Sequence, residues 1–94
     1  MAIVSFKDRR LALVLARRSP KGFPSDLLSV TRRKLVVLDG AATLNDLRVP
    51  PANRLEALQG DRAGQYSIRV NDQFRLCFHW TEAGPADVEF ADYH

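Results

Sequence analysis

Apolar and polar positions alternate through most of the second half of the chain, which is the pattern of half-buried strands. Residues 66–70 and 73–80 form the clearest pair, and the turn sequence between them predicts an antiparallel hairpin. The alternation resumes in residues 87–92, after a second turn, and residues 54–59 predict one further strand before the hairpin. We therefore expect an antiparallel meander from residue 54 to the C-terminus.

The first half of the chain has helical rather than alternating periodicity. Leucines and a valine crowd residues 8–16 and predict a first helix, which ends before the two prolines and the glycine of residues 19–24. A second helix is predicted from Ser25 to Asp39, with Gly40 directly after it. The apolar face of this second helix consists of Leu27, Thr31, Leu35 and Leu38.

These elements fit one small domain. The chain of 94 residues is long enough to bury one core and too short for two. A short strand is predicted at residues 3–6, before the helices. We therefore expect a single α+β domain over residues 1–94, with two N-terminal helices packed on an antiparallel sheet in the order β-α-α-β-β-β-β.

Charge is distributed unevenly along this domain. Residues 1–80 hold all fourteen lysines and arginines with seven acidic residues, a net charge of +7, whereas residues 81–94 hold four acidic residues and no lysine or arginine. A basic body is typical of proteins that bind a polyanion such as RNA, although a merely soluble basic surface explains the charge equally well. The consecutive bases Arg32, Arg33 and Lys34 could meet RNA or an acidic partner, but we interpret them as the solvated face of the second helix.

Cysteine and histidine usage narrows the chemistry. Cys77 is the only cysteine, so no internal disulfide can form, and no His or Cys spacing resembles a metal site. Residues 1–8 reach charged positions too early for a secretory signal or a membrane span. We expect a cytoplasmic protein that needs neither a metal nor a cofactor.

The last three residues, Asp92-Tyr93-His94, place acid-base and hydrogen-bonding side chains at the end of a predicted strand. A terminus held against a sheet frays less than a free one, so this cluster could carry out acid–base chemistry. Strand parity places Arg69 and Arg75 on one face of the hairpin, and Glu56 could join them. We expect that face to be an open polar surface suited to a phosphodiester, because a guanidinium matches phosphate oxygens.

Several motifs in combination resemble the HigB branch of the RelE toxin superfamily. They are the Gly-Asp-Arg-x-Gly loop of residues 60–64, the Ser-Ile-Arg-Val-Asn sequence of residues 67–71 and the Asp-Tyr-His ending. The Ser-Phe-Lys-Asp sequence of residues 5–8 fits as well. Each motif is weak alone but quite specific in this combination, and the resemblance spans nearly the whole chain.

The resemblance implies a RelE-like fold and the toxin of a type II toxin–antitoxin pair. Such a toxin is a ribosome-dependent endoribonuclease that cleaves mRNA in the A site of the 70S ribosome and stops translation. It is neutralised by a HigA-like helix-turn-helix antitoxin, through which it also reaches operator DNA. The alternative is a noncatalytic binding protein that regulates translation or transcription through its antitoxin or the ribosome.

The resemblance also implies the site residues. Cleavage maps onto Asp92, His94 and Glu56, with the RNA 2′-OH attacking its own phosphate to give a 2′,3′-cyclic phosphate and a 5′-OH. His94 and Glu56 are assigned to proton transfer in either order, and Asp92 orients His94 or serves as base. Arg75 would stabilise the phosphorane, and Tyr93 would stack on a base or donate its hydroxyl.

Some assignments stay open at this stage. Glu56 stands where this family often has His, and Gln59 where it often has Lys, which keeps the noncatalytic alternative in play. Glu56 could equally be a structural carboxylate paired with Arg54 or Arg75, and Arg69 an ion-pair partner. The candidates for contact with RNA or the ribosome are Arg17, Arg18, Lys21, Arg48, Arg54, Arg62 and Arg69.

Overall fold

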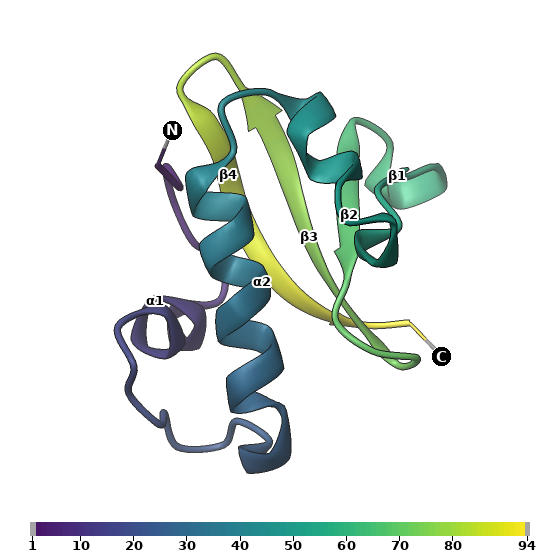
Figure 1. The fold of residues 1–94 in the computed structure, drawn as a ribbon. Helices are drawn as coiled ribbons and strands as arrows, with labels where there is room; N and C mark the ends of the chain where they lie inside the picture. The colour runs from purple at the N-terminus through teal and green to yellow at the C-terminus, as the bar shows by residue number, and fades with distance from the viewer. Residues whose placement is uncertain (1, 94) are drawn as a thin grey trace.

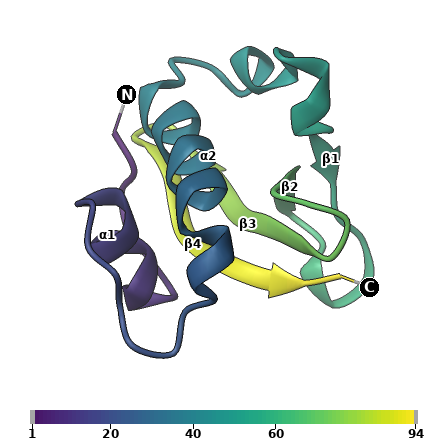
Figure 2. The same cartoon turned by 60° about the horizontal axis from the view of Figure 1, so that its bottom comes forward.

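Two helices cover one face of an antiparallel sheet in the computed structural model, which describes residues 2–93 (Figure 1). The helices are α1 (Arg9–Leu15) and α2 (Leu28–Gly40). In the turned view of Figure 2 both lie on the same side of β3 and β4, while short 3-10 segments continue from α2 towards β1. The expected α+β class is confirmed.

The sheet is the predicted meander. Its strands are β1 (Glu56–Ala57), β2 (Gln65–Arg69), β3 (Phe74–Thr81) and β4 (Gly84–Asp92), paired antiparallel in the order β1-β2-β3-β4. A register shift between Cys77 and His79 interrupts the β3–β4 pairing. Because β3 is central and long, it places the side chains of its two faces on the core and on the opposite surface.

Two predicted strands differ from the structure. Residues 3–6 run beside β4 but form no named strand. Their pairing with β4 consists of the parallel bridge between Phe6 and Val88 and two backbone hydrogen bonds, from the N–H of Val4 to the carbonyl of Pro85 and from the N–H of Val88 to the carbonyl of Ser5. The strand predicted at residues 54–59 shrinks to β1, since the 3-10 turn Pro51–Asn53 precedes it and Arg54 has a positive φ of 46°. Extended backbone can begin only after that left-handed residue.

Local sequence sets the ends of α1. Asp8 is the N-cap, and its carboxylate accepts hydrogen bonds from the backbone N–H and the guanidinium of Arg10. At the other end the N–H of Arg18 bonds the carbonyl of Leu13, and the N–H of Arg17 bonds that of Val14. This is a Schellman ending, and it puts Arg17 at a φ of 65°, where glycine is the usual residue.

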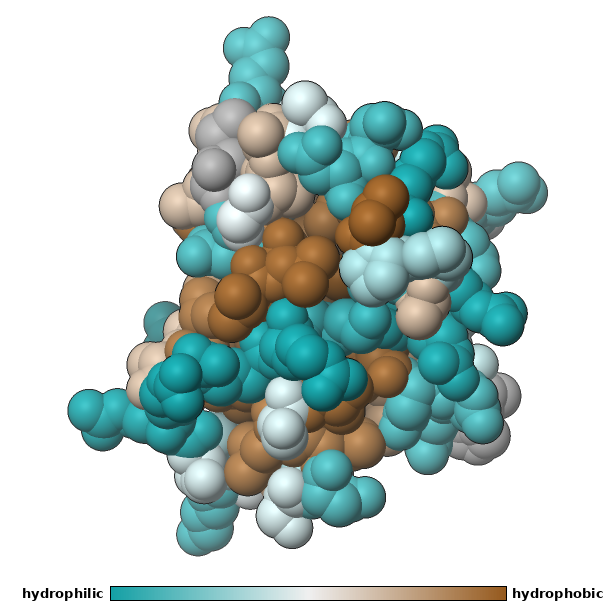
Figure 3. All heavy atoms as spheres, in the orientation of Figure 1, coloured by the Kyte–Doolittle hydropathy of each residue, from teal (hydrophilic) through white to brown (hydrophobic). Residues whose placement is uncertain are grey.

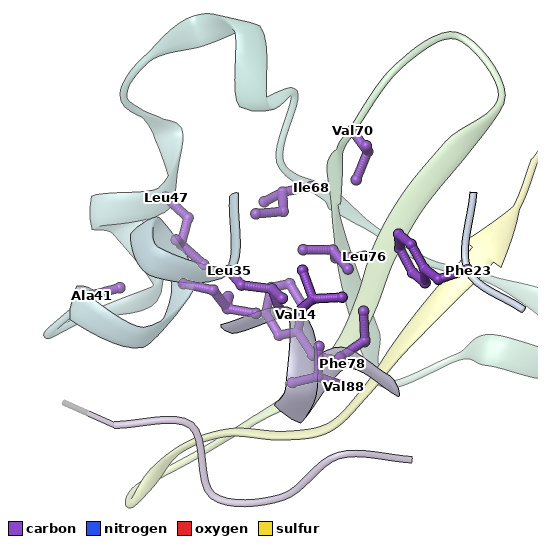
Figure 4. Close-up of a cluster of buried hydrophobic side chains, with 12 residues drawn as sticks. Val14, Phe23, Leu35, Ala41, Leu47, Ile68, Val70, Leu76, Phe78 and Val88 are labelled. Atoms are coloured by element: carbon purple, nitrogen blue, oxygen red, sulfur yellow. The ribbon is translucent and has the colours of Figure 1, made fainter. Parts of the chain in front are cut away.

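The core lies between the helices and the sheet. Leu11 and Val14 of α1 and the apolar face of α2 pack on the β2, β3 and β4 side chains labelled in Figure 4. Thr31, Leu35 and Leu38 are fully buried, as the helical period predicts, and Leu27 is half-buried. Ile68, Leu76 and Phe78 have no exposed surface, so the sheet contributes its largest side chains at the centre.

The predicted solvated face of α2 is wrong at one position. Lys34 is only 8% exposed, and its ammonium donates a 2.7 Å hydrogen bond to Oδ1 of Asn53, which is itself buried. Burial lowers the pKa of Lys34, and the nearby charges of Arg33 and Arg69 lower it further. Lys34 is buried by tertiary packing, because the 3-10 segments that follow α2 cover this side of the helix.

Candidate active site

A polar cleft lies where β1, the β2–β3 turn and the C-terminal residues meet. Its volume is about 340 Å³, and its lining residues are Arg54, Glu56, Arg69, Asn71, Asp72, Arg75 and Tyr93. The fold therefore brings together five residues that the sequence analysis singled out from three separate segments. Asn71 and Asp72 were predicted only as a turn. Their place in the hairpin turn between Arg69 and Arg75 was the signal for a role in the cleft.

Arg75 is the best-fixed charge of the cleft. Its Nε donates to Oγ of Ser67 at 2.6 Å, and its Nη2 donates to the carbonyl oxygens of Arg54 and Ser67. Its Nη1 lies 3.7 Å from Oε1 of Glu56. With 11% of the side chain exposed, the guanidinium presents one edge to the cleft while its other donors are occupied by protein.

The expectation of an open polar surface on this sheet face is wrong. Ser67 and Cys77 are fully buried and Arg75 is nearly so. The backbone of Arg54 covers Arg75 from the β1 side, and Tyr93 lines the same cleft as Arg75 from the C-terminal segment. The segments before and after the hairpin thus fold over its polar face and narrow it to a cleft.

Glu56 stands at the open rim. It pairs across the sheet with Ser67, and 59% of its side chain is exposed. Its Oε1 lies 3.7 Å from Nη1 of Arg75, so the ion pair with Arg75 that the sequence left open does form. An exposed pair of this kind adds little to stability, so it does not by itself explain why the carboxylate is there.

Tyr93 is anchored through its backbone. Its N–H donates a 2.6 Å hydrogen bond to the carbonyl oxygen of Gln73, which holds the chain end against the hairpin turn. Burial raises the pKa of the Tyr93 hydroxyl and that of the Cys77 thiol. Both groups are therefore protonated near neutral pH, and the Tyr93 hydroxyl is available as a hydrogen-bond donor rather than a base.

Asp92 does not line the cleft. It pairs with Phe74, so the register places it on the helix-facing side of the sheet, whereas Arg75 pairs with Ala91 and faces the other way. Its Oδ2 accepts a 3.1 Å hydrogen bond from Nε2 of Gln73. Parity within residues 87–92 could have shown this, since Asp92 alternates in step with Phe90. His94 lies outside the described residues, so its assignment stays a prediction.

The basic residues predicted to contact RNA are scattered. Arg69 reaches the cleft and forms an ion pair with Asp72. Arg62 instead binds Glu89 through two hydrogen bonds of 2.9 and 3.1 Å, which raises the pKa of Arg62 and lowers that of Glu89. Arg48 donates to Asn45.

Of the four remaining basic candidates, Arg54 lines the cleft and the other three lie away from it. Arg17 and Arg18 line a second groove beside α1, and Lys21 is exposed on the loop that follows. Between residues 2 and 93 no group of three or more His, Cys, Asp or Glu side chains could hold a metal ion. No helix in the same range is long and apolar enough to cross a membrane.

Comparison with known proteins adds the family. Residues 4–94 match the model of the HigB-like toxins, described as RelE-like toxins of the type II toxin–antitoxin system HigB. The chain is 46% identical over 71 residues to Toxin HigB-1 of Vibrio cholerae serotype O1, covering 76% of this chain and 74% of the relative. It is 28% identical over 92 residues to Endoribonuclease HigB of Proteus vulgaris, covering 98% and 99% of the two chains. This chain therefore belongs to the HigB-like toxins of type II toxin–antitoxin systems.

Proposed function

We propose that this toxin is an endoribonuclease that cleaves mRNA in the ribosomal A site, inhibits translation and growth, and is neutralised by a HigA-like antitoxin. Family membership and the name of the Proteus vulgaris relative support the activity. The observation that carries the proposal is Arg75, a nearly buried guanidinium with one edge turned to a cleft beside Glu56 and Tyr93. The antitoxin would also connect the toxin to operator DNA.

The cleft geometry fits cleavage by the 2′-OH of the RNA itself. Glu56 is exposed at the rim and takes the proton of the 2′-OH, while the Nη1 edge of Arg75 stabilises the charge on the phosphorane. Arg75 needs little rearrangement for this task, because Ser67 and the Arg54 carbonyl already fix its plane. The products are a 2′,3′-cyclic phosphate and a 5′-OH, without a metal.

The remaining steps use the chain end. His94 protonates the leaving 5′ oxygen, since an imidazolium can donate a proton near neutral pH. Asp92 positions the terminal residues through its hydrogen bond with Gln73. Tyr93 is 42% exposed beside the cleft and can stack on a base or donate its hydroxyl to a phosphate oxygen.

Basic residues at the rim would hold the RNA backbone. Arg54 and Arg69 both line the cleft and are candidates for phosphate contacts, which would make binding depend on salt. Arg48 and Lys21 are exposed and farther away, so they fit contacts with the ribosome rather than with the scissile phosphate. Arg62 is held by Glu89 and is the weakest of these candidates.

The test is 5′-end mapping of a defined mRNA on programmed 70S ribosomes. Wild-type protein is compared with Arg75→Lys, His94→Ala and Asp92→Ala, with Arg9→Lys as a control at an exposed arginine outside the cleft. We expect cuts with wild type and with Arg9→Lys, only when ribosomes are present, and 5′-OH ends at those cuts. The Arg75 and His94 variants should lose them.

One alternative would emerge from the same experiment. Glu56 already contacts Arg75 and Asp92 lies off the cleft, which is compatible with a protein that blocks the A site without cutting. If wild-type protein stalls translation and no new 5′ ends appear, the noncatalytic function replaces the nuclease. If free mRNA is cut at the same sites, ribosome dependence is wrong.

A further inference from the structure

A second groove lies on the helical layer, between the end of α1 and the outer face of α2. It encloses about 560 Å³ and shares no lining residue with the polar cleft. Four arginines line it, two from the end of α1 and two from α2: Arg17, Arg18, Arg32 and Arg33. We call it the arginine groove.

The charges of the arginine groove are not neutralised within residues 2–93. None of its four guanidinium groups forms an ion pair with a carboxylate of that range, whereas Arg10, Arg62, Arg69 and Arg75 all do. The Nε of Arg32 is buried and has no hydrogen-bond acceptor. A buried donor without an acceptor is uncommon in folded proteins, because it loses its bonds to water without replacement.

The backbone holds one of these arginines at an unfavourable position. Arg17 occupies the left-handed residue of the Schellman ending of α1, with a φ of 65°. Glycine adopts this conformation at no steric cost, and a side chain there is disfavoured. The chain nevertheless places a guanidinium at that point, and that guanidinium lines the groove.

The floor of the groove is aliphatic. Leu28, Arg32 and Val36 follow one another at four-residue intervals on α2, so an arginine lies between two apolar side chains on one line of the helix. Val36 is 45% exposed. Figure 3 shows hydrophobic surface above and below a group of hydrophilic side chains over α2.

We propose that the arginine groove binds an acidic amphipathic helix of the antitoxin polypeptide. Apolar side chains of such a helix would cover Leu28 and Val36, and its carboxylates would pair with the exposed ends of the four guanidinium groups. A partner with only acidic groups would leave the aliphatic floor exposed. The identity of the partner rests on the proposed toxin–antitoxin function, while the chemistry of the segment rests on the groove.

RNA fits the arginine groove less well. The lining residues include no aromatic side chain on which a base could stack, and an aliphatic floor offers nothing to a sugar-phosphate backbone. The assignment therefore moves Arg17 and Arg18 from the predicted ribosome contacts to the antitoxin surface. Arg54 and Arg69 remain with the RNA, on a different part of the molecule.

The groove can be tested with the full-length toxin and a synthetic peptide. The probe is a fluorescein-labelled peptide of Leu, Glu and Ala with Leu at every fourth position and Glu beside it, and the control has the same composition in scrambled order. Binding is measured by fluorescence anisotropy and located by chemical shifts of ¹⁵N-labelled protein. We expect shifts at Val14, Leu28 and Val36 and affinity about tenfold higher for the ordered peptide than for the scrambled one.

Variants separate the groove from general charge. Arg33→Ser and Val36→Ser should each lower the affinity for the ordered peptide about tenfold. The controls are Arg9→Ser and Leu13→Ser, at exposed positions of α1 outside the groove, which should leave that affinity unchanged. Arg17→Gly should lower the affinity for the ordered peptide, while the melting temperature of the protein stays the same or rises. A purely structural role for Arg17 would instead lower the melting temperature.

Three results would overturn the proposal. Equal binding of the two peptides would show attraction of charge without recognition of a helix. If oligouridylate displaces the peptide, and Arg33→Ser lowers the affinity of the protein for oligouridylate, the groove is a nucleic-acid surface. Shifts confined to the polar cleft would place the peptide elsewhere.

Cleavage on ribosomes keeps the two proposals apart. Arg33→Ser and Val36→Ser should cut mRNA at the wild-type rate, because neither residue lines the cleft. Normal cleavage without peptide binding would reject the groove and keep the nuclease. If wild-type protein binds the peptide but does not cleave mRNA, the groove is kept and the nuclease is rejected.

Discussion

The polar cleft and the arginine groove of this toxin both contain arginines, but within residues 2–93 the protein bonds the guanidinium group of one and leaves those of the other unpaired. In the polar cleft, Arg75 is nearly buried and its donors are occupied by Ser67 and the Arg54 carbonyl. In the arginine groove, Arg32 has a buried donor with no acceptor and Arg17 has a disfavoured backbone. A fixed charge suits a transition state, since it need not reorganise as negative charge develops. An unneutralised set suits a partner that brings its own carboxylates.

The largest expected effect comes from Arg75→Lys. Lysine keeps the positive charge but cannot reproduce the planar fork that reaches Ser67 and the Arg54 carbonyl at once. We expect the single-turnover rate of mRNA cleavage on ribosomes to fall about a thousandfold, the scale of losing one preorganised donor. Circular dichroism and the melting temperature show whether the variant is folded. A folded variant that cuts at the wild-type rate would remove Arg75 from the mechanism.

Glu56→Gln is expected to separate activity from stability. The carboxylate is largely exposed and its ion pair with Arg75 spans 3.7 Å, so the free energy of unfolding should change by less than about 0.5 kcal/mol. Cleavage should slow about a hundredfold, the lower end for loss of a general base, because water at the open rim can replace the proton acceptor.

Two outcomes would decide the role of Glu56. A slower rate at unchanged melting temperature supports proton transfer. An unchanged rate would leave Glu56 as the structural carboxylate that its contact with Arg75 also allows. Ala57→Ser, at the neighbouring exposed position of β1, is the matched control for changes in the edge strand itself.

Lys34 of α2 connects the helix that carries part of the arginine groove to the Arg54 segment of the polar cleft. It lies next to Arg33 of the groove, yet its ammonium is buried and bonds Asn53, the residue before the Arg54 carbonyl that holds Arg75. Lys34→Ala would leave Oδ1 of Asn53 without its donor, so we expect a loss of about 2 kcal/mol in the free energy of unfolding, measured in urea. Arg33→Ala, one residue earlier and exposed, should cost less than about 0.5 kcal/mol.

The pair of Arg62 and Glu89 gives a smaller, pH-dependent effect. Arg62 lowers the pKa of Glu89 below its ordinary 4.5, so the unfolded chain takes up the proton first on acidification. The contribution to stability is therefore present above pH 4.5 and is lost as the pH falls from there through the lowered pKa. We expect Glu89→Gln to cost about 1 kcal/mol at pH 7 and to approach wild-type stability at acidic pH. A constant difference across the range would contradict this account.

Sequence periodicity predicted most of this fold because the relevant signals are local. The helices, the hairpin and the terminal strand follow from spacing alone, and hairpin parity placed Arg69 and Arg75 on one face. The strand at residues 3–6 failed because pairing there depends on β4, more than eighty residues away in the chain. Lys34 was misplaced for a similar reason, since its acceptor Asn53 lies nineteen residues later.

The candidate site shows the same limit. Glu56, Arg75 and Tyr93 do meet in one cleft. That cleft is narrow because the backbone of Arg54 lies over Arg75, and hydrophobic periodicity in the sequence does not predict this contact. Asp92 was grouped with the others because it is adjacent in sequence, although strand alternation puts it on the opposite face from Arg75. Adjacency in a strand separates side chains rather than joining them.

Arg17→Gly is the smallest expected change and the one that bears most directly on the difference between the two regions. Glycine relaxes the left-handed position at the end of α1, but it also makes the unfolded chain more flexible. We expect a net gain of up to about 0.5 kcal/mol in the free energy of unfolding, read from urea denaturation. Arg18→Gly, at the next and unstrained position, should instead destabilise slightly. If both variants lose stability equally, Arg17 is held by contacts of its own, and the groove would resemble the cleft in using a fixed arginine.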